Sequence, residues 1–195
     1  MVTMTHRTLD LSKGFHTSDA ALVAASLDDQ SRLLFRDLEG AAPDELQWQP
    51  HPGMNTIGML LAHMAIVEAW WTLIIVGKTD PATVRPILGI GDDDDGMPAK
   101  PGASPIAFLD GKDLAFYRDL HAKARAYFTK MAAGMSDNDL VAETLRKRDD
   151  GTEVGISGRW YLYHVLEHFS GHYGQILLLR HLYRDAKARG GSKSG

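Results

Sequence analysis

Three histidines recur at every fourth position of an apolar stretch near the end of the chain, HVLEHFSGHYGQILLLRHLY, which runs from His164 to Tyr183. In an α-helix, residues i and i+4 lie on one face about 6 Å apart, so a His-x-x-x-His pair can bind one metal ion. His164 and His172 are two such steps apart, ~12 Å along the helix axis. They cannot both bind the same ion. The possible pairs are His164 with His168 and His168 with His172, so His168 belongs to both.

A third imidazole would have to come from elsewhere, and His63 is the candidate. It lies within a second apolar stretch, MLLAHMAIVEAWW, where burying an imidazole is unfavourable unless the ring has a partner. Three imidazoles with an open coordination position are typical of catalytic or ligand-exchanging sites. Imidazole suits zinc, nickel, copper or iron. Such an ion lowers the pKa of a bound water molecule or deprotonates a thiol.

The same histidines allow two other interpretations. They can be hydrogen-bonded core or boundary residues with no metal. Alternatively, H-V-L-E-H, from His164 to His168, matches the H-x-x-E-H metalloprotease pattern, with Glu167 as general base. That pattern needs a downstream carboxylate ligand, and Asp185 of the same helix is the only acid after His168. The residues alone do not decide between a metal site and hydrogen-bonded histidines without metal. The H-x-x-E-H alternative lacks a third ligand.

Four segments with helical periodicity must position these side chains. They run from about Ser18 to Leu38, from about Asn55 to Val76, from about Ser104 to Met131, and from about Ser157 to the residue before Gly190. Thr17 and Thr56 are among the candidate N-caps of the first two. The second segment is apolar nearly all round, so we expect it at the centre of the fold.

The connections define the architecture. Prolines, glycines and an acidic run in residues 78–105 predict a long crossover between the second and third helices. Asp150–Gly151, flanked by short extended runs, predicts a small hairpin before the fourth. We therefore predict an all-α fold, a four-helix bundle whose interior can hold a metal site on facing helices. Residues 1–189 form the single domain and residues 190–195 a disordered tail.

Composition limits the function. The net charge is −4 and the pI is about 6.1, which argues against nucleic-acid binding. The chain has no cysteine, which excludes disulfides, cysteine-ligated zinc and a thiol nucleophile of its own. The N-terminus lacks an apolar run of signal-peptide length. We also expect no apolar run close to the ~20 residues that span a bilayer. The expected location is cytoplasmic.

Two further stretches resemble binding features. The run Asp92 to Asp95 begins like a calcium loop but lacks the glutamate at the twelfth position, so we interpret it as a solvated acidic loop. Trp70 and Trp71 can line a pocket, although adjacent aromatics on a central helix are usually one core residue and one boundary residue.

Taken together, NTIGMLLAHMAIVEAWW and WYLYHVLEHFSGHYGQILLLR resemble the DinB-like (DinB/YfiT-like) superfamily of metal-dependent enzymes. Its second helix begins with Asn-Thr or Ser-x-Gly and continues to a histidine, and its last helix resembles His-x-x-x-His-x-x-His-His-Arg-Gly-Gln-Ile. The resemblance implies a four-helix bundle in which a divalent ion is held by His63, His168 and His172. This chain departs from the pattern at Gly171 and Tyr173, where the family often has histidine and arginine.

The resemblance assigns the neighbouring residues as well. His164 falls one turn before the ligands, as a pocket residue or one that contacts a ligand. Glu167 and Gln175 are candidates to orient an imidazole. For both, the alternative is a solvated or interhelical polar contact, which we favour for Gln175.

The resemblance also implies the chemistry. Members of the superfamily are thiol-dependent S-transferases that use mycothiol, bacillithiol or glutathione, or hydrolases. We expect zinc or nickel, with iron or manganese as alternatives, and a small-molecule substrate such as a low-molecular-weight thiol. A homodimer is the assembly that we consider. We expect neither nucleic acid nor a membrane as a partner. The alternative function is a non-catalytic metal-binding or damage-response bundle.

Overall fold

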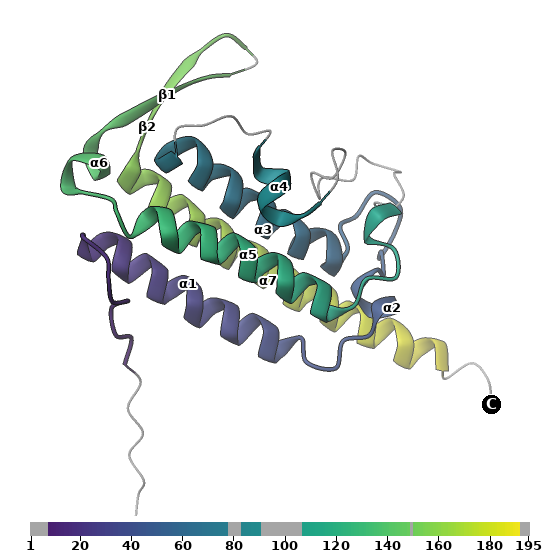
Figure 1. The fold of residues 1–195 in the computed structure, drawn as a ribbon. Helices are drawn as coiled ribbons and strands as arrows, with labels where there is room; N and C mark the ends of the chain where they lie inside the picture. Colours follow the sequence, from purple (N-terminus) through teal and green to yellow (C-terminus); the bar gives the residue numbers. More distant parts are fainter. Residues whose placement is uncertain (1–7, 78–82, 91–106, 149, 192–195) are drawn as a thin grey trace, which may run out of the picture.

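Four long helices lie side by side in the computed structural model, which describes residues 8–77, 83–90, 107–148 and 150–191 (Figure 1). They are α1 (Ser18–Asp37), α3 (Ile57–Thr72), α5 (Leu114–Ala132) and α7 (Gly158–Gly191). Helix α3 packs against both α5 and α7, and α1 packs against α7 and α5. The predicted all-α four-helix bundle is confirmed.

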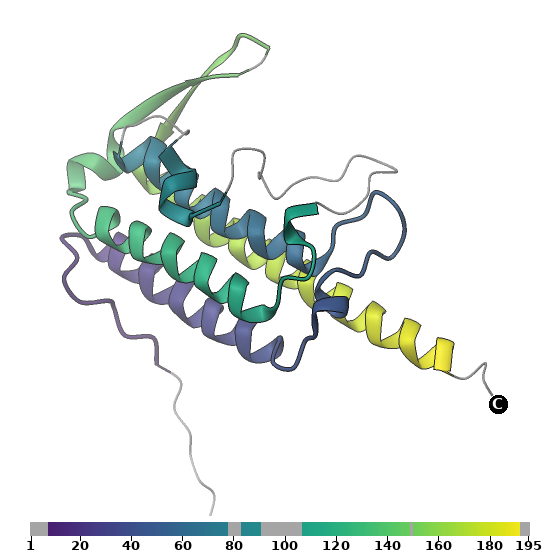
Figure 2. The same ribbon diagram turned by 45° about the vertical axis from the view of Figure 1, so that its right-hand side comes forward.

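Shorter elements connect these helices. They are α2 (Pro43–Leu46), the π-helical turn η1 (Leu73–Gly77), α4 (Val84–Leu88), the 3-10 turn η3 (Ala107–Leu109), α6 (Asp137–Val141), β1 (Glu143–Lys147) and β2 (Glu153–Ser157). The hairpin of β1 and β2 projects from one end of the bundle, and the last turns of α7 extend beyond the other helices at the opposite end (Figure 1, Figure 2).

The starts of α1 and α3 lie where the sequence predicts them. The side chain of Thr17 accepts a hydrogen bond from the backbone N–H of Ala20, and that of Thr56 accepts one from the N–H of Met59. Each cap satisfies a backbone donor that the first turn leaves without a partner. The position of His63, two turns into α3, is thereby fixed.

The start of the third helix differs from the prediction. Helix α5 begins at Leu114, about ten residues after Ser104. Gly111 adopts a positive φ of 69°, which turns the chain, and the Asp113 side chain accepts a hydrogen bond from the N–H of Phe116. Gly111 thereby separates η3 from a newly capped helix within the segment that we expected to be one helix.

Helix α3 and η1 form the apolar centre of the bundle. Contrary to our expectation, the span Ile57–Gly77 is long and apolar enough to cross a membrane by length and composition. In the fold, however, 61% of its most apolar window is buried, because α5 and α7 cover α3. Its apolar character is that of a central core helix.

The predicted hairpin is confirmed. Strands β1 and β2 pair antiparallel, with Glu143 opposite Ser157 and Lys147 opposite Glu153. Gly151 has a φ of 84°, and the Asp150 side chain accepts hydrogen bonds from the backbone N–H and hydroxyl of Thr152. Successive side chains of β1 alternate between the two faces, so Arg146 is less exposed than Lys147.

Three other predictions concern the loops and the tail. The acidic run Asp92 to Asp95 lies outside the described residues, as do residues 192–195 of the tail. Helix α7 continues to Gly191, slightly beyond the end that we expected.

Candidate metal centre

The three histidines that the resemblance selects lie together between α3 and α7. The Nε2 atom of His168 is 3.1 Å from the Nε2 of His63 and 3.1 Å from the Nε2 of His172. The three ligand atoms lie within 4.8 Å of one another. Helix α7 supplies two of them through its i, i+4 spacing, and α3 supplies the third because it packs against α7.

The spacing fits a divalent first-row ion. Zinc binds histidine nitrogens at ~2.0–2.1 Å, which sets two nitrogens of a tetrahedral site about 3.3 Å apart. The two 3.1 Å separations are close to that value. The three rings are half-buried, so the cluster can bind an ion and still admit a further ligand.

The electrostatics of the cluster favour neutral imidazole. Burial, followed by charge repulsion from the neighbouring His172, His63 and His164, lowers the pKa of His168 to about 3. A neutral ring keeps the lone pair that a metal ion needs. His168, the central member, is therefore ready to bind an ion at neutral pH.

Gln175 fixes the orientation of His172. Its side-chain oxygen Oε1 lies 2.8 Å from Nδ1 of His172. Since an amide oxygen can only accept, Nδ1 carries the proton and Nε2 presents its lone pair to the cluster. Gln175 thus makes the imidazole contact that we considered for it, while its side chain is also exposed to solvent, the alternative that we favoured.

His164 lies one turn away and faces a different environment. Its ring stacks on Trp160 at 4.7 Å between centroids and contacts the edge of Trp71 at 5.2 Å. Its Nδ1 lies 3.4 Å from a carboxylate oxygen of Glu167. Among the described residues, the grouping that can hold an ion contains His168 but neither His164 nor Glu167. The H-x-x-E-H alternative gains no support from this geometry.

A cavity of about 810 Å³ adjoins the histidines on the side of His164. Trp71 and Trp160 line it from the helices, and Arg146 and Ile156 line it from the hairpin. The ring of His164, which also lines it, is 5.8 Å from that of His168. The cavity therefore adjoins the candidate metal centre. Trp71 lines this cavity, which is the first of the two roles that we considered for Trp71.

Arg146 is the cavity residue that the sequence did not single out. Its guanidinium lies 4.3 Å from the centroid of Trp70 and 5.0 Å from that of Trp71. The alternation of ETLRK in β1 predicts which face Arg146 occupies, but not that the hairpin folds back over a tryptophan pair of α3.

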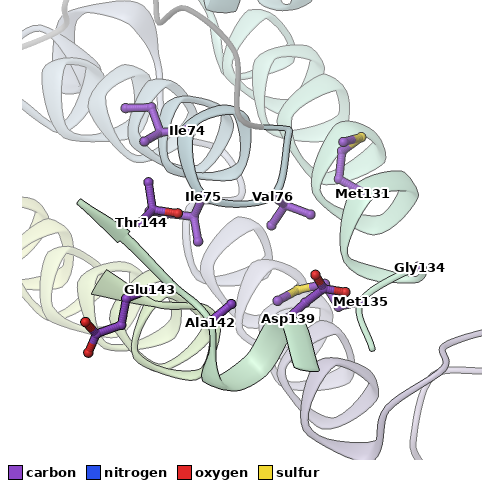
Figure 3. Close-up of a pocket in the computed structure, with 10 residues that line it drawn as sticks. All are labelled: Ile74, Ile75, Val76, Met131, Gly134, Met135, Asp139, Ala142, Glu143 and Thr144. Atoms are coloured by element: carbon purple, nitrogen blue, oxygen red, sulfur yellow. The ribbon is translucent and has the colours of Figure 1, made fainter. Parts of the chain in front are cut away.

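A second cavity, of about 640 Å³, lies between η1, the end of α5 and β1. Figure 3 shows Ile75, Met135 and Thr144 among its walls. Its lining contains no histidine. It is therefore separate from the metal centre.

Comparisons with known proteins agree with this geometry. A crystal structure described as the conserved protein of a locus from Enterococcus faecalis is 14% identical, with a TM-score of 0.59, and the match covers 83% of this chain and 94% of that one. At this identity the likeness shows the fold alone. No curated protein matches the chain.

The family comparison is more specific. Residues 22–185 match the mycothiol S-transferase family, and the match spans α3 and α7 and thus all three clustered histidines. The chain belongs to the mycothiol S-transferase family, within the metal-dependent DinB-like superfamily.

Proposed function

We propose that this protein is a metal-dependent S-transferase that uses a low-molecular-weight thiol, with mycothiol as the first candidate. Family membership supports the reaction class. The observation that carries the proposal is the convergence of three histidine nitrogens within 4.8 Å beside a cavity of about 810 Å³. A bundle that bound metal without turnover would need no such cavity, so the cavity favours the enzyme over the non-catalytic alternative.

His63, His168 and His172 would hold the ion, with zinc or nickel as the expected metal and iron or manganese as alternatives. An ion bound there supplies acidity, because coordination deprotonates a thiol at neutral pH. The chain contributes the other requirements. Burial keeps His168 neutral, and Gln175 holds the proton of His172 on Nδ1, away from the ion.

The thiol must be a substrate, because the chain has no cysteine. Family membership favours a thiol over water as the group that is activated, and thus a transferase over a hydrolase. In the transfer, the thiol loses its proton and its sulfur forms a bond with an electrophilic carbon of the second substrate, while a leaving group departs from that carbon with the electron pair of its broken bond. Glu167 is exposed, and its carboxylate contacts His164, which lines the cavity.

We also propose a cytoplasmic location and a homodimer. Low-molecular-weight thiols are kept reduced inside cells, which supports the location. The exposed apolar side chains of Val141, Leu145 and Tyr163 support an assembly, because such side chains are often covered in oligomers.

Thermal unfolding with a panel of thiols tests the choice of substrate. Mycothiol, bacillithiol and glutathione are compared with and without zinc or nickel. Glycerol, which has no thiol group, serves as the control. A ligand that binds the native state raises the melting temperature by mass action. We expect the largest metal-dependent rise with mycothiol. Equal shifts with and without metal would contradict the proposal.

A further inference from the structure

The cavity beside the metal centre is positively charged, although the chain is acidic overall. Arg146, Lys147 and Arg148 line it, and Asp150 is the one acidic residue in the described lining. The Asp150 carboxylate already accepts two hydrogen bonds from Thr152. Three cations against one carboxylate leave the described lining with a net positive charge, which favours an anion.

Arg146 is the best-placed of these cations. Its guanidinium makes no ion pair among the residues that the structure describes. Partial burial against Trp70 and Trp71 lowers its pKa, which reflects the cost of holding a charge away from water without a counterion. A planar guanidinium presents paired donors that match a carboxylate, so a carboxylate ligand would supply the missing counterion.

Another part of the cavity lining is aromatic. The rings of Trp160 and His164 are stacked with an interplanar angle of 13°, and Trp71 meets both rings edge-on, at 5.8 Å and 5.2 Å. Trp160 is nevertheless 43% exposed. Aromatic faces left open in a cavity favour a flat, largely apolar ligand.

We infer that this cavity binds the electrophilic second substrate, and that this substrate is a flat apolar molecule carrying a carboxylate, with the carboxylate on Arg146 and the apolar body against Trp71, His164 and Trp160. This assignment rests on the proposed S-transferase function. The volume of about 810 Å³ lies within the range of ligand pockets, roughly 300–1,000 Å³. The ring of His164, which lines the cavity, lies 5.8 Å from the ring of His168, so the cavity and the three-histidine cluster are neighbours.

Calorimetric titration with two simple probes tests the inference. The probes are 2-naphthoate and its neutral counterpart 2-naphthalenemethanol, and the protein is titrated both zinc-loaded and metal-free. We expect the wild type to bind the carboxylate more tightly than the alcohol. Arg146→Gln should weaken naphthoate binding roughly tenfold, the loss expected for a charge-assisted contact, and leave binding of the alcohol nearly unchanged. Trp71→Ala should weaken both.

Two control variants accompany these substitutions. Arg184→Gln removes an exposed arginine of α7 and should leave both affinities unchanged, which separates local recognition from net charge. Arg146→Lys keeps the charge but not the paired donors, and we expect intermediate naphthoate binding. If Arg146→Gln fails to fold, the wild-type comparison of the two probes together with Arg146→Lys decides the matter.

The outcomes separate this inference from the proposed function. Arg146-dependent naphthoate binding by metal-free protein supports the cavity assignment even if no thiol transfer is found. Equal binding of both probes, or naphthoate binding that Arg146→Gln leaves unchanged, would overturn it. Displacement of naphthoate by mycothiol would show that the cavity holds the thiol instead, and would overturn the assignment to the electrophile.

Discussion

Nε2 of His63 lies 3.1 Å from Nε2 of His168, although the two residues are 105 positions apart in the sequence. One belongs to the central helix α3 and the other to the C-terminal helix α7. An ion held by both would link the two helices, and its binding energy would add to the stability of the native state. The predictions below start from this contact.

We predict that His172→Ala abolishes binding of zinc or nickel, whereas His164→Ala retains about one ion per chain. His172 points its Nε2 to the cluster, while the ring of His164 stacks on Trp160. Elemental analysis after metal reconstitution and gel filtration measures the difference. Retention of metal by His172→Ala together with its loss in His164→Ala would instead favour the H-x-x-E-H site.

Gln175→Leu should reduce metal affinity roughly 10- to 100-fold, the usual effect of removing a partner that orients a ligand. The substitution removes Oε1, the acceptor that holds the His172 proton on Nδ1 in the described residues. Competition with a chromogenic chelator measures the affinity. The matched control is Ser170→Ala, since the Ser170 hydroxyl is exposed and, among the described residues, donates to the Leu166 carbonyl of its own helix alone. An unchanged affinity for Gln175→Leu would show that packing alone orients His172.

The buried histidine His121 should make the free energy of unfolding depend on pH. Its Nε2 donates a hydrogen bond to the Leu61 carbonyl at 2.9 Å, and burial, followed by the charge of Arg125, lowers its pKa to about 3. The unfolded chain takes up the proton near pH ~6.5, whereas the folded chain takes it up only near pH 3. The free energy of unfolding should therefore fall as pH drops from about 6.5 toward 3, by up to about 1.4 kcal/mol per pH unit.

Urea unfolding of metal-free protein at about pH 7 and about pH 5 measures this dependence. His121→Leu removes one of the two contributions and should reduce the slope with pH, while the contribution of His168, whose pKa is also about 3, remains; the variant also loses the bond to Leu61. The comparison therefore concerns the slope with pH and not the stability at one pH. A slope identical to that of the wild type would exclude His121 as its source.

Arg125 joins three helices from a partly buried position, with 13% of its side chain exposed. It donates to both carboxylate oxygens of Glu68 on α3, and to Asp28 and Ser31 on α1. Glu68 is 2% exposed. Arg125→Met would leave that carboxylate buried without its partner, which costs about 3–5 kcal/mol.

The exposed pair of Arg32 and Asp29 is the matched control, and Arg32→Met should cost less than about 1 kcal/mol. Chemical denaturation of both variants measures the two costs. The double variant Glu68→Leu with Arg125→Met should regain much of the stability, because neither charge of this pair then remains to be buried. Equal costs for Arg125→Met and Arg32→Met would contradict a buried, coupled role.

The sequence predicts those features that depend on local patterns. Thr17 and Thr56 cap helices whose apolar periodicity is plain, and Asp150–Gly151 forms its hairpin, because both depend on neighbouring residues. The clustering of His63 with His168 and His172 could be expected only from the spacing on α7 combined with the family resemblance. The predicted start of α5 was wrong, because the positive φ of one glycine, Gly111, decides whether this segment forms a single helix or two elements.

The remaining features depend on tertiary contacts. Nothing in the local sequence of Arg146 indicates that it packs over Trp70 and Trp71. The contact of Glu68 with Arg125 likewise joins residues 57 positions apart. Gln175 lies three residues after His172 on one helix, a spacing that permits the observed contact, but its exposed position allows solvent contact equally well.

The central claim is that His63, His168 and His172 hold an ion that makes a thiol reactive. The most direct measurement is the initial rate of mycothiol conjugation to a generic electrophile by wild-type protein as purified, after chelation, and after return of zinc or nickel. We predict that chelation abolishes the rate, that metal restores it, and that metal does not restore it in His168→Ala. A rate that survives chelation, or persists in folded His168→Ala, would contradict the claim.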